Sequence, residues 1–395
     1  MSKKVKYTIA IVLFCTFLIC LGMSLIFPVM PFIRNEYHFS AFQMGTMSSL
    51  FALVQFAASP VVGQLSDRFG RKPMLVWGLL IFGLAEFLFA IGNQLWMFDL
   101  SRAVDGLSAA MFVPTSMALA ADITSTADRA KVIGWLSAAF SGGLILGPGI
   151  GGMLAGISYK APFWVAGILA IISTIVAAIF LPKDSDEEIY DGAEARPPRE
   201  GIFKAMKKMA SPTMTVLFLM ILISAFGLAG FESIYSLYVN QVHHFTLSTI
   251  AGVLTVNGIL SLFLQVFMFD RMVLWIGETG IIRWGFILSV IGTIFVIYDH
   301  SQWQVFVATL VVYVSFDMLR PAITTLLTKL SKQNQGLLNG INMSLTSVGN
   351  VVGPLLSGAL LDINYQYPYW LVIIFLTIAI FITFRLKQMV KNSVN

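Results

Sequence analysis

Charged residues are scarce in this chain. Asp, Glu, Lys and Arg make up 11% of its 395 residues, whereas an average soluble domain has about 25%. A chain so poor in charge is not an ordinary water-soluble globular protein. The pI is about 9.1, but the basic residues stand in short hydrophilic breaks and form no basic domain. We therefore expect no binding of nucleic acid.

Cysteine and histidine are also rare. Cys15 and Cys20 are the only cysteines; they stand on one expected helix, with backbones more than about 7 Å apart, too far for a disulfide. The four histidines fall in expected outer loops: His38, His243, His244 and His300. His243 and His244 have no further acidic or histidine neighbour that would complete a metal site. We expect no metal, no cofactor and no enzyme, because no nucleophile–base set is present either.

Long apolar runs dominate the rest of the sequence. The chain is 57% hydrophobic, with a mean hydropathy of +0.82. About twelve runs are each long enough to cross a bilayer, which takes roughly 20 residues. This pattern predicts an all-α membrane protein embedded in the lipid bilayer. The expected spans are residues 7–33, 43–63, 73–94, 97–121, 130–155, 161–182, 212–240, 246–270, 279–299, 302–328, 335–361 and 367–386.

The first run is expected to be a membrane helix and not a secretory signal. It follows Lys3, Lys4 and Lys6, as a signal peptide would. A signal peptide, however, has an apolar core of about 7–15 residues followed by a small-residue cleavage site. This run is longer and contains Pro28 and Pro31.

Two stretches in different halves of the chain repeat one pattern. Gly143–Trp164 aligns without a gap with Gly349–Trp370, so that Gly147-Pro148 falls on Gly353-Pro354. Internal repeats are frequent in secondary transporters, which place the substrate site at the repeat interface. We expect two pseudo-symmetric six-helix bundles, residues 1–182 and 212–395. The acidic, proline-containing segment 183–211 should be the linker between them.

Basic residues predict the orientation. Of the 25 Lys and Arg residues, only Arg34 and Lys160 fall in expected outer loops, and Arg102 and Arg320 lie inside spans. The remainder lie in segments on the side of the N-terminus. Cytoplasmic loops favour Lys and Arg, so both termini and the linker are expected in the cytoplasm, in a multi-pass protein of the bacterial cytoplasmic membrane.

A glycine-rich basic motif joins the second and third spans. It reads G-Q-L-S-D-R-F-G-R-K-P, from Gly63 to Pro73, and its two glycines allow a tight turn. The order Gly-x-Leu-x-Asp-Arg-x-Gly-Arg-Lys resembles the signature loop of the major facilitator superfamily. That resemblance implies a gating role for Gly63, Asp67, Arg68, Gly70 and Arg71.

Three further segments resemble motifs of that superfamily's drug/proton antiporters. They are Leu21–Pro31, Ser101–Ala110 with an arginine inside the membrane, and Gly143–Gly152, which reads G-L-I-L-G-P-G-I-G-G. A generic small-residue packing face is the alternative for the last, but four motifs in order favour the family. Small residues allow close helix packing, and proline bends a helix. We expect helix packing at Gly143, Gly147, Pro148, Gly151, Gly152, Gly353 and Pro354.

The similarity extends to NorA-type quinolone and multidrug exporters. It rests on Ala225–Tyr238, Phe316–Thr324 and Thr346–Leu355, and it covers essentially the whole chain except the linker. It implies a drug-binding lining, since aromatic rings bind planar cationic compounds. For any single phenylalanine, packing against helices or lipid is the competing interpretation. The implied lining is Phe27, Phe51, Gln55, Phe140, Ser141, Tyr313, Phe316, Asn342 and Asn350.

Ionisable residues deep in apolar runs are the strongest functional signal. A charge at mid-bilayer costs about 2.5–3.5 kcal/mol or more, so such residues usually have a function. We expect Glu232 and Asp317 to couple transport to protons. Arg102 and Arg320 are the expected charge partners, although a purely structural pair remains open for Asp317 and Arg320. Glu86 and Asp99 are less informative.

One residue departs from the resemblance. Asp105 stands where NorA-type pumps usually carry Gly or Gln, three residues after Arg102 and within reach of an ion pair. It would mute or tune that arginine.

These features predict a monomeric exporter of amphipathic drugs, such as fluoroquinolones, dyes and quaternary ammonium compounds, that exchanges them for protons. A narrow exporter of a sugar, tetracycline or a lipid precursor on the same fold is the alternative. A membrane enzyme or a sensor is less consistent with the sequence, because we expect neither a catalytic set nor a soluble output domain.

Overall fold

The described part of the chain is helical. The structure is a computed structural model that describes residues 3–182, 211–330 and 335–394, and no strand occurs in these ranges. The first group of helices is α1 (Lys3–Leu25), α2 (Met30–Tyr37), α3 (Ala41–Phe69), α4 (Arg71–Ile91), α5 (Leu95–Asp122), α6 (Thr126–Ala155) and α7 (Ala161–Phe180). The second is α10 (Pro212–Val242), α11 (Leu247–Phe263), the π-helical turn η1 (Leu264–Met268), α12 (Phe269–Tyr298), α13 (Gln302–Leu330), α14 (Gln335–Ile363) and α15 (Tyr367–Val394).

These helices cross a membrane many times. Among the described residues, eleven helical stretches are long and apolar enough for a span. One of them, Leu247–Tyr298, is 52 residues long and contains two of the expected spans. Gly277 separates them with a φ of 70°, a left-handed backbone conformation that glycine adopts without strain. The chain is therefore a multi-pass, all-α membrane protein.

The first expected span ends earlier than the apolar run suggests. Helix α1 stops at Leu25, turns follow, and the short helix α2 starts at Met30. Pro28 lies in the break and Pro31 at the start of α2. A proline has no backbone N–H and clashes with the preceding turn, so it ends a helix but fits the first turn of the next.

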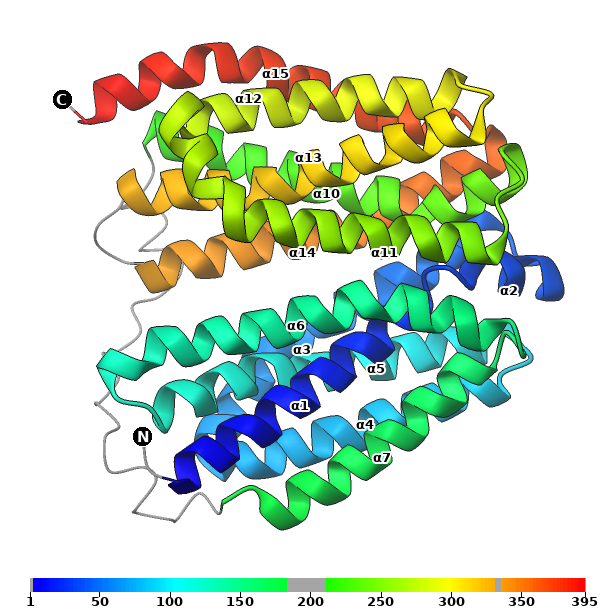
Figure 1. Ribbon diagram of the computed structural model, residues 1–395, viewed down its shortest axis with the longest axis vertical. Helices are drawn as coiled ribbons and strands as arrows, with labels where there is room; N and C mark the ends of the chain where they lie inside the picture. The colour runs from blue at the N-terminus through cyan, green and yellow to red at the C-terminus, as the bar shows by residue number, and fades with distance from the viewer. Residues whose placement is uncertain (1–2, 183–210, 331–334, 395) are drawn as a thin grey trace. The chain divides into compact units, whose positions relative to one another are not determined.

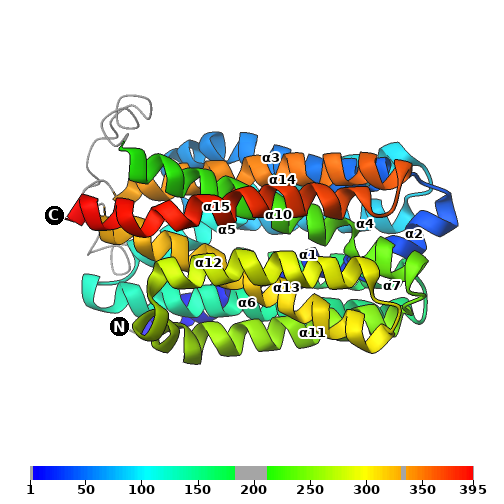
Figure 2. The same cartoon turned by 90° about the horizontal axis from the view of Figure 1, so that it is seen from above.

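The chain forms two compact units. Unit 1 is Met1–Phe39, Leu50–Arg196 and Thr246–Thr255, and unit 2 is Ser40–Ser49, Pro197–Phe245 and Val256–Asn395. The expected linker, 183–211, falls almost wholly outside the described residues. Within each unit the long helices run along a common direction (Figures 1 and 2).

The helices of the two units pack in the same pattern. In unit 1, α1 contacts α6 and α7, while α4 contacts α5 and α7. In unit 2, α10 contacts α14 and α15, while α12 contacts α13 and α15. The sequence repeat covers the ends of α6 and α14 and the starts of α7 and α15. The sequence and the helix packing therefore identify the same internal duplication.

Candidate functional site

Two carboxyl groups lie near each other inside unit 2. Glu232 stands on α10 and Asp317 on α13, two helices that pack together. Both side chains are half-buried, and their charges are close enough to interact. Two carboxylates cannot both stay ionised cheaply at such a place, because burial and like charge each disfavour the charged form. The arrangement is suited to binding a proton.

Asp317 is held by a neutral partner. Its Oδ2 accepts a hydrogen bond of 2.5 Å from the Ser261 hydroxyl of α11. That hydroxyl also lies 3.4 Å from the side-chain oxygen of Asn257, one turn earlier. Arg320, the partner expected from the sequence, is exposed. Its charge acts on Asp317, but the hydrogen bond goes to Ser261 because α11 brings a hydroxyl directly to the carboxylate.

Ser261 and Asn257 were not anticipated from the sequence. The two residues are four apart, on one face of α11, and both are buried. Serine and asparagine are common in membrane helices as hydrogen-bonding residues between helices. Their spacing was therefore a visible signal, but it did not identify Asp317 on another helix as the group they serve.

An aromatic cluster surrounds this region of unit 2. Tyr313 packs edge-on against Phe231 and Tyr235, with ring centroids 5.4 and 5.6 Å apart. Tyr369 contacts Phe231 and packs edge-on against Tyr238. The Tyr313 hydroxyl is buried and, among the described residues, has no hydrogen-bond partner. It lies in the field of both Glu232 and Asp317, so Tyr313 belongs to the surroundings of the two acids.

The other residues of the expected drug lining are distributed over both units. In unit 2, Phe316 is buried and its ring lies near Gly227. Asn342 donates to the Thr324 hydroxyl at 3.2 Å, which joins α14 to α13, while Asn350 is exposed. In unit 1 the expected lining residues are all partly buried: Phe27, Phe51, Gln55, Phe140 and Ser141.

A three-residue charge cluster lies inside unit 1. Arg102 on α5 donates to Asp105 Oδ2 at 2.8 Å and to Glu86 Oε1 on α4 at 3.1 Å. Its guanidinium lies over the Phe89 ring, 4.9 Å from the centroid. The side chain of Asp105 therefore meets Arg102 as the spacing predicts. Glu86 also belongs to this charge cluster. The sequence did not reveal this, because spacing along the chain does not show how α4 and α5 pack.

The glycine-rich basic motif is an ordered corner between α3 and α4. Arg71 pairs with Asp67 at 2.7 Å and with Asp122 at the end of α5 at 2.8 Å, and it also donates to Ser66. Gly70 between the helices has a φ of 97°, which an L side chain rarely adopts. The motif thus ties three helices of unit 1 together at one end.

The remaining motif residues lie in the same corner. Arg68 stands near the Phe69 ring, and a side chain at Gly63 would meet nothing within 4 Å. Gly63 therefore has no close-packing role in this structure.

The glycines of the repeated motif allow close helix contact. A Cβ at Gly143 or Gly151 would lie 2.5 Å from a backbone carbonyl of α1, and one at Gly147 would lie 2.7 Å from the Leu21 carbonyl. In unit 2, a Cβ at Gly353 would lie 2.9 Å from the Gly230 nitrogen of α10. Gly152 faces Ala251 instead. Pro148 and Pro354 lie within α6 and α14, which continue past them.

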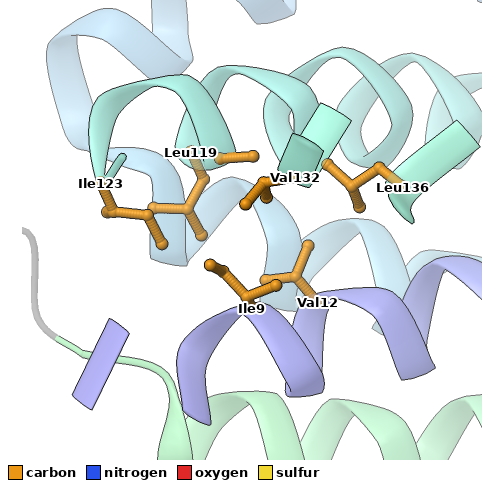
Figure 3. Close-up of a pocket in the computed structure, with 7 residues that line it drawn as sticks. Ile9, Val12, Leu119, Ile123, Val132 and Leu136 are labelled. Carbon is orange, nitrogen blue, oxygen red and sulfur yellow. The ribbon is translucent and has the colours of Figure 1, made fainter. Parts of the chain in front are cut away.

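A small cavity in unit 1 has no chemical features of a functional site. It lies where α1, α5 and α6 meet, and aliphatic side chains such as Ile9, Leu119 and Val132 form its wall (Figure 3). Such a wall offers neither a proton acceptor nor a partner for a charged ligand.

Comparison with known proteins gives the family. The Major Facilitator Superfamily family model matches residues 12–283 and 217–394. Multidrug resistance protein 1 of Bacillus subtilis (strain 168) is 40% identical over 98% of this chain and 98% of its own length. Quinolone resistance protein NorA of Staphylococcus aureus is 34% identical over 92% of each chain.

Solved structures show the same fold. A bacterial homologue of the human lysosomal transporter Spinster, in an inward-facing and unoccupied conformation, superposes with a TM-score of 0.83. It is 16% identical and covers 100% of this chain and 99% of its own. The nucleoside transporter NupG gives 0.80 at 11% identity, over 97% and 98%. The family model and the two relatives show that the chain belongs to the major facilitator superfamily.

Proposed function

We propose that this protein exports amphipathic drugs, such as fluoroquinolones, dyes and quaternary ammonium compounds, in exchange for protons. It would act as a monomer in the bacterial cytoplasmic membrane, with both termini in the cytoplasm. Multidrug and quinolone resistance proteins among its relatives support the substrate class. The observation that carries the proposal is that Glu232 and Asp317 stand on the packed helices α10 and α13, beside the aromatic cluster of unit 2.

Competition between proton and drug provides the coupling. When Glu232 and Asp317 are protonated, the site is neutral and has little attraction for a cationic drug. When a carboxyl group loses its proton, a cationic drug replaces it as the counter-charge. A ligand shifts a conformational equilibrium only through its different affinity for the two states. Proton and drug therefore drive the transporter in opposite directions.

Drug efflux from cells that express the chain tests the proposal directly. We expect energised cells to export ethidium and norfloxacin, and to stop when the pH gradient is collapsed. Glu232→Gln should abolish this export, because the amide cannot take up or release a proton, while the amount of protein in the membrane stays unchanged.

Glu36→Gln is the matched control. Glu36 is exposed, so we expect the variant to export both drugs at the parent rate. Full export by Glu232→Gln would remove that residue from the coupling. Failure of the parent protein to move either drug would favour the narrow exporter of a sugar, tetracycline or a lipid precursor.

A further inference from the structure

We propose that Glu86, Arg102 and Asp105 form a second, exchangeable proton-binding site, located in unit 1. The idea deepens the proposed function, because it adds a proton carrier to the drug/proton exchange. Glu86 and Asp105 are 0% exposed and Arg102 is 5% exposed. The cluster connects α4 and α5 through the two ion pairs described above.

The charges of the cluster do not balance. Two carboxyl groups share one guanidinium, so full ionisation would leave one uncompensated negative charge in an apolar bundle. An isolated buried charge is costly enough that a group usually neutralises instead. One bound proton on the two carboxyl groups would make the cluster neutral.

Free hydrogen-bonding positions are present for that proton. Arg102 engages one oxygen of each acid, and the other oxygens, Glu86 Oε2 and Asp105 Oδ1, are buried without a partner among the described residues. A buried polar atom without a partner has lost its hydrogen bonds to water and is therefore unfavourable. Protonation converts one of these oxygens into a neutral hydroxyl and removes the excess charge.

Among the described residues, no second cation forms an ion pair with the two acids. Helix α7 has no ionisable side chain, and Lys160 just before it donates to the Gly92 carbonyl beyond the end of α4. Helix α3, which packs against Gly106 of α5, carries Asp67 and Arg68 in its last turn. The basic residues of α1, α4 and α6 lie near the starts of those helices: Lys3, Lys4, Lys6, Arg71, Lys72, Arg129 and Lys131. The acidic Asp128 also lies at the start of α6. Glu86 follows Arg71 by about four helical turns, roughly 22 Å at 1.5 Å per residue. On α5, Asp99 precedes Arg102 by one turn and Asp122 is at the far end; both are acidic.

The duplicated fold shows that this cluster is not needed for packing. Trp77-Gly78 of α4 aligns with Trp284-Gly285 of α12, and Pro114 of α5 with Pro321 of α13. Gly78 packs against Phe112, and Gly285 packs against Leu319, which is the equivalent residue. In this alignment Glu86, Arg102 and Asp105 correspond to Thr293, Thr309 and Val312.

Those three counterparts are buried and neutral. The hydroxyls of Thr293 and Thr309 donate to carbonyls of their own helices. The equivalent helix pair of unit 2 is therefore packed with neutral side chains at these three positions. Of the two equivalent packing sites, the one in unit 1 contains the charged cluster. Because the packing does not require these charges, we assign them a function in unit 1.

Infrared spectroscopy of the purified protein tests the site without any transport measurement. The carbonyl stretch of a protonated carboxylic acid reports a bound proton, and its shift in heavy water reports exchange. A Glu232→Gln, Asp317→Asn background removes the two acids of the candidate site in unit 2. In that background we expect a buried carboxylic-acid band that disappears at high pH and shifts in heavy water.

Further substitutions should change the band in opposite directions. Adding Glu86→Gln leaves Arg102 and Asp105 as a balanced pair, so the band should vanish. Adding Arg102→Gln removes the cation that pairs with both acids, so both should be protonated and the band should grow to about twice its size. Glu36→Gln should leave it unchanged.

The proposal is overturned if the background protein shows no such band, or if the band survives Glu86→Gln unaltered. It is also overturned if the band neither shifts in heavy water nor responds to pH, since the proton would then be fixed. If Arg102→Gln does not fold, Glu86→Gln still decides. Because the band is measured without drug, a failure of drug efflux in cells would refute the proposed function and leave this result standing.

Discussion

At the scale of single residues, ionisable side chains of both candidate sites have partners on other helices. Asp317 is bound by Ser261, and Arg102 by Glu86. Sequence alone identified the charged residues, because an ionisable group in an apolar run is conspicuous. It could not identify these partners, since each pair joins two helices whose contact depends on tertiary packing.

Ser261 should be required for efficient export. Ser261→Ala removes a hydrogen bond to a charged acceptor, which is worth about 1.5–3 kcal/mol, so we expect norfloxacin efflux to fall by roughly ten- to a hundredfold. Ser261→Thr keeps the hydroxyl and should keep most of the rate. The control is Ser137→Ala, because Ser137 is exposed and its hydroxyl donates to the Ile133 carbonyl of its own helix. Equal rates for Ser261→Ala and Ser261→Thr would show that the hydroxyl is irrelevant.

His243 should make unit 2 less stable in acid. It lies just beyond α10, and burial lowers its pKa from the usual value of 6.5, more than its hydrogen bond to the Val296 carbonyl raises it. The unfolded chain therefore binds this proton at a higher pH than the folded chain does. Stability is full above pH 6.5 and declines as the pH falls below it.

Thermal unfolding of the purified protein over that pH range measures the effect. His243→Gln keeps a donor for Val296 but does not titrate, so its melting temperature should depend less on pH. His244→Asn is the control, because His244 is exposed and its positive φ suits asparagine. Identical pH slopes for the parent and His243→Gln would contradict the assignment.

At the scale of helices, hydropathy predicts the spans well because each must fill the bilayer with apolar side chains. The exceptions have local causes: Pro28 and Pro31 divide the first run, and Gly277 turns the chain inside a continuous helical stretch. Hydropathy does not report which helices touch. The repeated glycines predict part of these contacts, because helices that approach closely need residues without side chains at the contact.

Bulk at Gly147 should separate α1 from α6. Gly147→Leu places a side chain against the Leu21 carbonyl, and overpacking of this kind costs about 1–3 kcal/mol. We expect a clearly lower melting temperature and less protein in the membrane. Gly134→Leu, on the same helix but with nothing within 4 Å of the added Cβ, should melt like the parent. If both variants melt alike, close contact at Gly147 is not what stabilises this pair.

At the scale of the whole molecule, the positive charges predict its orientation in the membrane. Native Cys15 and Cys20 are buried, so cysteines introduced at exposed positions can be labelled over a low background. A membrane-impermeant maleimide should modify Ser158→Cys in intact cells. It should modify Asp270→Cys only after the membrane is permeabilised. The opposite result would invert the topology, and the parent protein measures residual labelling of the native thiols.

The duplicated packing makes each half of the protein an internal reference for the other. Helices α4 and α5 match α12 and α13 in contacts but not in charge. Any property that arises from the shape of the scaffold should appear twice, once in each copy. Any property that appears once must come from the side chains in which the copies differ. Transplanting Thr293, Thr309 and Val312 into unit 1 as Glu86→Thr, Arg102→Thr and Asp105→Val would therefore separate architecture from chemistry within a single chain.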